Sequence, residues 1–309
     1  MPVWGFLLSL LVASMWAISP ILMKKGMKRA GPNEVNPIRS FSYLLTMTIA
    51  FVVLGDGTYP TLTPLLLLGL IVNVSTSAVM GDQLYIFSIN KIGASLAVSI
   101  SCGYPLIATF FSILLLGEQI TTLVWIGTVC IICGLIVIKL ASSKKRSNAL
   151  ELSNRDRHAA TETFKGIVFA VGAAVCWGAN MPFMKMLMVQ GNWTAVELYF
   201  LRSVIFICVV WGLRLFLFKK FRRAVMPLKK VPLKSWLAFL ASGSVAMAIA
   251  GILYGYCISM MPVSVVTPIT ASSPFVTVLI ARLFYREKLS RLQNVGIVLV
   301  IAGSIAVSL

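Results

Sequence analysis

Long apolar runs alternate with short polar segments along the whole chain. A helix that crosses the hydrocarbon core of a bilayer, about 30 Å thick, needs roughly 20 predominantly apolar residues. On this pattern we expect helices over ten ranges: 3–23, 35–54, 64–89, 94–116, 121–140, 165–188, 195–218, 234–259, 263–285 and 290–308. The fold class that follows is an all-α membrane protein with ten transmembrane helices.

Composition agrees with a chain that folds in lipid. Of its 309 residues, 59% are hydrophobic and 12% are charged, whereas a soluble domain keeps about a quarter of its residues charged. The net charge of +18 raises the question of nucleic-acid binding, but the 27 Lys and Arg residues lie in short segments between apolar runs, without a recognition element. We therefore expect a small-molecule substrate and membrane lipids as partners, and no nucleic acid.

Few residues offer chemistry for catalysis or metal binding. All six cysteines fall inside apolar segments, where a free thiol packs as a small hydrophobic group. The only histidine, His158, lies in a polar segment. We accordingly expect no enzymatic activity, no metal site and no cofactor.

The two sides of the polar segment 141–163, which we interpret as a linker, match each other. A constant offset of 169 residues superposes three pairs: Tyr85 and Tyr254, Pro105 and Pro274, and Glu118 and Glu287. This indicates an internal duplication, with one repeat over 1–140 and the other over 164–309. Five helices per repeat is an odd number, so the second repeat must enter the membrane from the opposite side. Inverted-topology repeats of this kind place the substrate site of a transporter near the midplane, between the halves.

Charge predicts the orientation. Of the 27 Lys and Arg residues, all except Lys185 and Arg202 fall at one face of the membrane, in or beside the loops that follow the odd-numbered helices. The positive-inside rule makes those loops cytoplasmic and both termini external. We expect a multi-pass protein of a prokaryotic inner (plasma) membrane.

An ordered set of short motifs then becomes informative. The first half contains Trp16-Ala17, Gly81-Asp82-Gln83-Leu84-Tyr85, Tyr104-Pro105 and Leu116-Gly117-Glu118. The second half contains Cys176-Trp177-Gly178-Ala179-Asn180, Ser273-Pro274 and Arg286-Glu287. In this order they resemble the drug/metabolite transporter superfamily, specifically the EamA-type permeases with two five-helix repeats.

The resemblance covers nearly the whole chain and implies a central cavity lined by the first four helices of each half, with the fifth helix at the periphery. Members of that family export amino acids and other metabolites, or take up sugars and other small molecules, so the fold does not define the substrate. The small multidrug resistance relatives use a glutamate in the first helix to exchange protons for cations. The first helix here has no acid, so we do not expect that mechanism in its usual form.

Polar and aromatic groups within the apolar helices are the candidate substrate contacts, because such groups are unfavourable against lipid. Trp16 and Trp177 lie near the middle of their helices, away from the interface where Trp usually concentrates. The full set that we expect to bind substrate is Trp16, Ser19, Asp82, Tyr85, Ser99, Tyr104, Trp177, Asn180, Tyr254, Thr267 and Thr270.

For the charged residues within the helices, the sequence leaves both a role in transport and a structural role open. Asp82 could bind an amine or take up and release a proton during transport, or it could form an ion pair with Lys91 or Arg39. Arg39 and Arg202 are repeat mates that could act as gates or attract carboxylates, or they could extend from helix ends to the interface. For Glu118 a structural role, as a helix cap or partner of a cation, is favoured.

The function that these features favour is secondary active transport of a small polar metabolite by alternating access. An amino acid or related compound is the preferred substrate, and export the preferred direction. The alternatives are a flippase for a lipid-linked sugar and an uptake permease for a sugar or nucleoside. Coupling to a proton or another ion stays open.

Overall fold

The computed structural model describes residues 3–55, 60–147, 156–218, 228–273, 275–276 and 291–308. Helices account for nearly all of this part of the chain, and it contains no β-strand. The first half comprises α1 (Val3–Gly26), α2 (Val35–Leu54), α3 (Pro64–Val74), the π-helix η2 (Ser75–Gly81), α4 (Asp82–Ser101), α5 (Tyr104–Leu116) and α6 (Thr122–Ser147), with a 3₁₀ turn η1 (Pro32–Glu34) before α2.

The second half repeats this order. It comprises α7 (Asp156–Gly191), α8 (Ala195–Phe218), α10 (Leu233–Ser242), the π-helix η3 (Gly243–Ile249), α11 (Ala250–Met260), α12 (Val263–Ala271) and α14 (Arg291–Ser308). The two π-helices occupy corresponding places, each of seven residues and each in the middle of the third expected helix of its half. A π-helix is rare and often marks a functional site.

Within the described residues, six helical stretches are long and apolar enough to cross a membrane. Three shorter apolar helices, Tyr104–Leu116, Thr122–Val137 and Asn294–Val307, accompany them. The helix expected over 263–285 is described only in part, so the count of ten stays a prediction. The all-helical fold class itself is confirmed.

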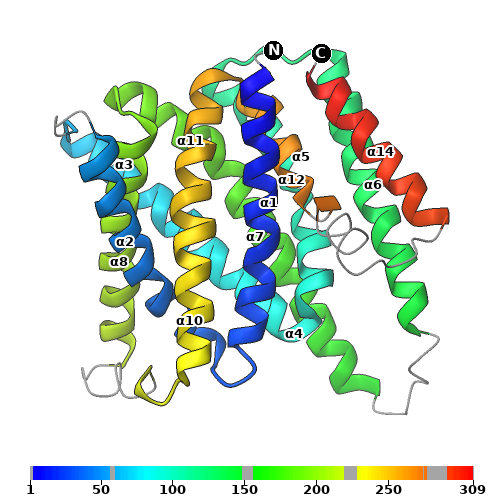
Figure 1. The fold of residues 1–309 in the computed structure, drawn as a ribbon, viewed down its shortest axis with the longest axis horizontal. Helices are drawn as coiled ribbons and strands as arrows, with labels where there is room; N and C mark the ends of the chain where they lie inside the picture. The colour runs from blue at the N-terminus through cyan, green and yellow to red at the C-terminus, as the bar shows by residue number, and fades with distance from the viewer. Residues whose placement is uncertain are drawn as a thin grey trace.

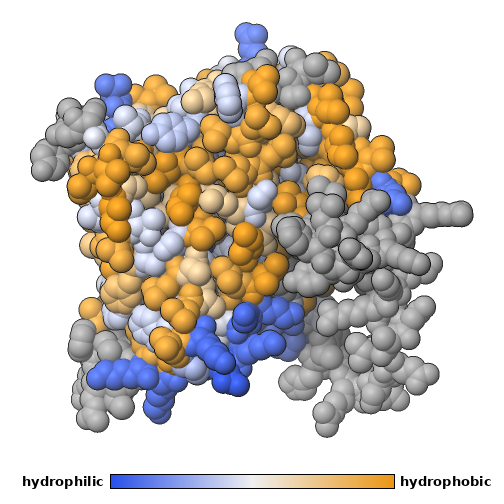
Figure 2. Space-filling model, viewed as in Figure 1, coloured by the Kyte–Doolittle hydropathy of each residue, from blue (hydrophilic) through white to orange (hydrophobic). Residues whose placement is uncertain are grey.

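The outer surface is that of a protein surrounded by lipid. Large apolar side chains such as Trp4, Leu65 and Phe216 are about three-quarters exposed, and an exposed apolar surface of this extent is unfavourable in water. Figure 2 shows apolar residues over the middle of the molecule and a band of hydrophilic residues along its lower edge. Exposed basic residues at the ends of α1 and α10, including Lys24, Lys25 and Lys234, belong to that end.

Corresponding helices of the two halves run in opposite directions. In Figure 1, α1 descends from the upper end while α7 ascends, and α2 ascends while α8 descends. The start of α1 and the end of α14 lie together at the upper end, opposite the basic residues. We call these the terminal end and the basic end.

The fifth helices, α6 and α14, pair at one side of the molecule (Figure 1). Glycines permit their close approach: a Cβ atom on Gly127 would lie 2.6 Å from the Gly303 carbonyl oxygen, and one on Gly134 would lie 2.6 Å from that of Gly296. The repeated glycines thus have a role in helix packing, as small residues do in membrane helices generally.

Two boundaries differ from the sequence-based expectation. The helix expected over 94–116 is interrupted at Cys102 and Gly103, where α4 ends and α5 begins with Pro105 in its first turn. Proline lacks the N–H that would continue the helical hydrogen bonds and disfavours helical backbone before it. In addition, α6 and α7 extend into the expected linker from both sides.

Candidate functional site

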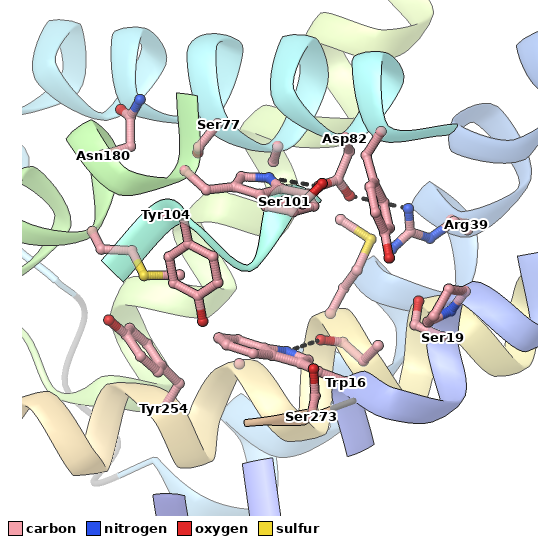
Figure 3. Close-up of a pocket in the computed structure, with 18 of the residues that line it drawn as sticks. Trp16, Ser19, Arg39, Ser77, Asp82, Ser101, Tyr104, Asn180, Tyr254 and Ser273 are labelled. Carbon is pink, nitrogen blue, oxygen red and sulfur yellow. Dashed lines mark hydrogen bonds and ion pairs between the residues drawn. The ribbon is translucent and has the colours of Figure 1, made fainter. Parts of the chain in front are cut away.

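A cavity of about 200 Å³ lies between the two halves. A buried site needs roughly 10–15 Å³ of such space to hold one water molecule, so this cavity has room for a small solute. Its walls come from α1, α2, η2, α4 and α5 of the first half, and from α7, α8, η3 and α11 of the second. Figure 3 shows aromatic, hydroxyl and charged side chains directed at one shared space.

Ten of the thirteen residues singled out from the sequence line this cavity. They are Trp16, Ser19, Arg39, Asp82, Tyr85, Tyr104, Trp177, Asn180, Arg202 and Tyr254. The side chain of an eleventh, Ser99, lies outside the described residues. The structure therefore brings most of the expected set together, and their contact with a substrate remains a proposal.

Thr267 and Thr270 do not line the cavity. Both are fully buried on α12, where their hydroxyls lie 3.4 Å from the Tyr254 hydroxyl and 3.3 Å from the Tyr104 hydroxyl. In this structure these threonines orient two tyrosines that do face the cavity, and their own contact with substrate stays a prediction. No residue of α12 (Val263–Ala271) is among the lining residues of the cavity.

Two aromatic pairs join the halves across the cavity. The rings of Trp16 and Tyr254 have centroids 5.4 Å apart, and those of Trp177 and Tyr85 are 4.9 Å apart. In each pair the Trp belongs to the first helix of one half and the Tyr to the third helix of the other. The duplication is thus preserved in the side chains of the cavity as well as in the backbone.

Each indole also donates a hydrogen bond to the opposite half, but the acceptors differ. Trp16 Nε1 donates to the Ala246 carbonyl oxygen at 3.1 Å, within the π-helix η3. Trp177 Nε1 donates to the Asp82 carboxylate at 3.1 Å, directly after η2. The π-helix η3 thus supplies the acceptor for Trp16, whereas a side-chain carboxylate supplies the acceptor for Trp177.

Asp82 forms an ion pair and faces the cavity at the same time. Arg39 Nη1 lies 3.0 Å from its Oδ2 atom, and the Arg39 side chain also donates to Asn36. Lys91, the other cation considered for Asp82, pairs instead with Glu162. Of the two alternatives for Asp82, the ion pair with Arg39 is therefore the one present in this structure, with the carboxylate still on the cavity wall.

Arg202, the repeat mate of Arg39, has a different environment. Its guanidinium donates to Asn73 Oδ1 and, at 3.4 Å, to Ser77 Oγ, and it lies 5.5 Å from the centre of the Tyr199 ring. Within the described part of the chain, no carboxylate forms an ion pair with it. Arg202 is a cavity-lining cation held only by neutral groups.

Asn180 connects α7 to α3 rather than presenting a free amide. Its Oδ1 atom accepts hydrogen bonds from Asn73 at 3.2 Å and from Thr76 at 2.9 Å, and its Nδ2 atom donates to the Cys176 carbonyl at 2.7 Å. Because the Asn73 amino group is used in this way, its carbonyl oxygen faces Arg202. Asn180 is therefore a positioning residue for the wall around Arg202.

Several lining residues were not expected from the sequence. Among them are Tyr43, Ser77, Met184 and Tyr199, which all lie on the cavity wall. Tyr199 could have been found, because it lies one turn before Arg202 on the same helix face. Met184 could not have been found in this way, because a methionine in an apolar helix looks the same in the sequence whether it faces lipid or the cavity.

Glu118 joins the halves at the terminal end. Its carboxylate accepts the backbone N–H groups of Val263, at 2.8 Å, and Ser264, at 3.1 Å, which begin α12. Lys185 of α7 lies 3.5 Å from the same carboxylate. The expectation of a structural cap is confirmed, since a carboxylate at a helix N-terminus satisfies otherwise unpaired N–H groups.

The described residues contain no group of three or more His, Cys, Asp or Glu side chains that could hold a metal ion. The described part of the cavity wall offers aromatic faces, hydroxyls, one neutralised ion pair and one further cation.

Comparisons with known proteins agree with this description. The family model described as the EamA-like transporter family matches residues 3–140 and 164–309. An uncharacterized transporter from Clostridium kluyveri is 32% identical over 152 residues, which span 48% of this chain and 48% of that protein, so the match covers about half of the curated relative's length. A solved crystal structure superposes with a TM-score of 0.71 at 16% identity over 99% of this chain and 98% of the other, which shows the fold alone. Because the family model accounts for both halves, the chain belongs to the EamA-like transporter family.

Proposed function

We propose that this protein is a secondary transporter that carries a small polar metabolite across the membrane by alternating access. The observation that carries the proposal is the cavity between two oppositely directed halves, with matched aromatic pairs contributed by each. In an inverted repeat, the two halves can exchange conformations, and the site between them then opens to one face and the other in turn. Residues 1–140 and 164–309 form the two repeats in this proposal, joined by 141–163.

The contact of Glu118 with the start of α12 fits the role of a gate. It links the segment after α5 of the first half to the start of α12 of the second half at the terminal end, through hydrogen bonds that can separate without disturbing an apolar core. We propose that this contact forms when the cavity is closed to the terminal end and breaks when it opens there. Its repeat mate, Glu287, lies outside the described residues.

The size and lining of the cavity favour an amino acid or a related metabolite. A volume of about 200 Å³ is small beside the roughly 300–1,000 Å³ of drug-binding pockets. We propose export as the direction of transport, with the basic end in the cytoplasm and the terminal end outside, in accordance with the positive-inside rule. Coupling to a proton or another ion is a further part of this proposal that transport assays at imposed gradients can address.

Transport by purified protein in proteoliposomes tests the proposal directly. We expect accumulation of at least one radiolabelled amino acid or related metabolite, and we expect Trp177→Ala to reduce it at least tenfold because that side chain contacts Tyr85 and Asp82. Lys165→Gln, at an exposed position outside the cavity, is the matched control and should transport normally. If no amino acid, related carboxylate, sugar or nucleoside moves in either direction, the proposal is wrong.

A further inference from the structure

We propose that Arg202 binds a carboxylate of the transported molecule, and that this molecule is a small organic monoanion with an apolar or aromatic body. This inference rests on the proposed function and narrows its substrate class, from amino acids and related metabolites in general to those with a net negative charge. The starting point is a difference between the halves at one pair of duplicated positions.

The first half neutralises its own arginine, and the second half does not. Arg39 is paired with Asp82 at 3.0 Å. At the offset of 169 residues that relates Tyr85 to Tyr254, the position equivalent to Asp82 is Gly251. Gly251 lines the same cavity but has no side chain, so the second half has no carboxylate at the position equivalent to Asp82.

Tyr199 takes up the space where a side chain at position 251 would lie. A Cβ atom added to Gly251 would overlap the Tyr199 ring, and the same ring lies 5.5 Å from the Arg202 guanidinium. The second half thus replaces a carboxylate with an aromatic face, which attracts a cation weakly and leaves its charge in place.

The charge balance of the cavity follows. Among the described residues that line it, Arg39 and Asp82 cancel, and Arg202 is left as a single positive charge. An unneutralised cation at membrane depth is costly, and a carboxylate brought in by a ligand would remove that cost. A zwitterion would add an ammonium group to a cavity that is already positive, and a cation would add a second charge without a partner.

The position of Arg202 argues against simple extension to the membrane surface. It is the eighth residue of α8, so it lies about 10 Å along the axis from the start of that helix, at 1.5 Å per residue. Its guanidinium is held by Asn73 and Ser77 of the neighbouring helix, and its Nε donor is buried with no partner among the described residues. These contacts hold the side chain on the cavity wall.

The rest of the lining favours a monoanion with an apolar body over a phosphate. Arg202 is a single uncompensated cation, which matches one carboxylate rather than a doubly charged group. Trp16, Trp177, Tyr85 and Tyr254 supply flat apolar faces around the space. Offset or edge contacts with such rings suit an aromatic or unsaturated body.

Four compounds of nearly equal size separate charge from shape: 3-phenylpropionate, phenylalanine, phenethylamine and 3-phenylpropionamide. Binding to the full-length protein in nanodiscs is measured by calorimetry. We expect 3-phenylpropionate to bind most tightly, and Arg202→Gln to weaken its binding about 10- to 100-fold, the effect of losing a hydrogen bond between charged groups. Arg214→Gln, on the same helix but away from the cavity, is the matched control and should retain the preference.

A second variant keeps the arginine and cancels its charge. Asn73 already accepts a hydrogen bond from Arg202, so Asn73→Asp places a carboxylate there with little change of shape and should also abolish the preference for the monoanion. The proposal is overturned if phenylalanine or phenethylamine binds best to the wild type, if none of the four binds, or if the preference survives in folded Arg202→Gln. Proteoliposome transport separates the two claims: movement of the zwitterion alone refutes the monoanion and leaves the transporter, whereas binding of the monoanion without movement of any solute refutes transport.

Discussion

Removing the charge of Asp82 should destabilise the protein by stranding Arg39. In the structure, the Arg39 side chain is 4% exposed and that of Asp82 is 17% exposed. Asp82→Asn leaves a guanidinium in the membrane interior with only neutral partners, of which Asn36 at 3.2 Å is already bound. The variant tests whether this ion pair contributes to the free energy of unfolding or lines the cavity without stabilising the fold.

The magnitude can be worked from the contacts. Breaking a buried ion pair by removing one partner costs about 3–5 kcal/mol in soluble proteins. In the structure, Trp177 Nε1 donates a hydrogen bond to Asp82 Oδ1 at 3.1 Å. The amide oxygen of the asparagine can still accept this bond, so we expect a cost at the lower end of that range. At roughly 2 °C per kcal/mol for a chain of this size, a loss of about 3 kcal/mol lowers the unfolding temperature by about 6 °C.

The assay is thermal unfolding in detergent, followed by the fraction of monodisperse protein that remains after heating. The double variant Arg39→Gln with Asp82→Asn should recover part of the loss, because neither partner is then left charged and alone. Glu162→Gln, which breaks exposed ion pairs with Lys91 and Lys165, is the control and should change the unfolding temperature much less. If the two single changes simply add in the double variant, the pair has no coupling energy and the reasoning fails.

Three further predictions follow from the same contacts. Glu118→Gln should weaken the link between α5 and α12 and increase the rate at which an impermeant maleimide labels Cys102, a cavity-lining thiol, from the terminal end; an unchanged rate would remove Glu118 from the gate. Gly134→Leu should prevent close packing of α6 on α14 and abolish recovery of folded protein, whereas Gly212→Ala, where a Cβ meets no atom within 4 Å, should be recovered normally; equal recovery would contradict the packing argument. Trp177→Phe should lower the unfolding temperature more than Trp16→Phe, because hydrogen bonds to a charged acceptor contribute about 1.5–3 kcal/mol and those between neutral groups about 0.5–1.5 kcal/mol; the reverse order would refute that assignment.

Much of this architecture is predictable from the sequence, because a bilayer allows few solutions. Backbone groups in lipid must be satisfied within the segment, so a run of about 20 apolar residues can only be a helix. The duplication then relates one half to the other and indicates that the cavity lies between them. Trp16 and Trp177 were recognised because a Trp in the middle of a membrane helix is unusual.

Other features were out of reach for identifiable reasons. The π-helices η2 and η3 change the angular register of the helices that contain them, and in the first half Ser77 faces the cavity together with Asp82 and Tyr85. Periodicity arguments assume 3.6 residues per turn and fail where the helix is wider. The sequence also does not distinguish a hydroxyl that bonds a cavity tyrosine, as those of Thr267 and Thr270 do, from one that faces the cavity.

The duplication also indicates where specificity should be sought. Elements that both halves retain, such as the Trp–Tyr pairs and the π-helices, serve the exchange of conformations, since that exchange requires the halves to be equivalent. A substrate has no such symmetry, so the groups that recognise it should be those in which the halves differ. The contrast between Asp82, which pairs with Arg39, and Gly251, which occupies the equivalent position in the second half, is a difference of this kind at the cavity wall. Exchanging the two environments should therefore alter which molecules are carried, while leaving the ability to change conformation intact.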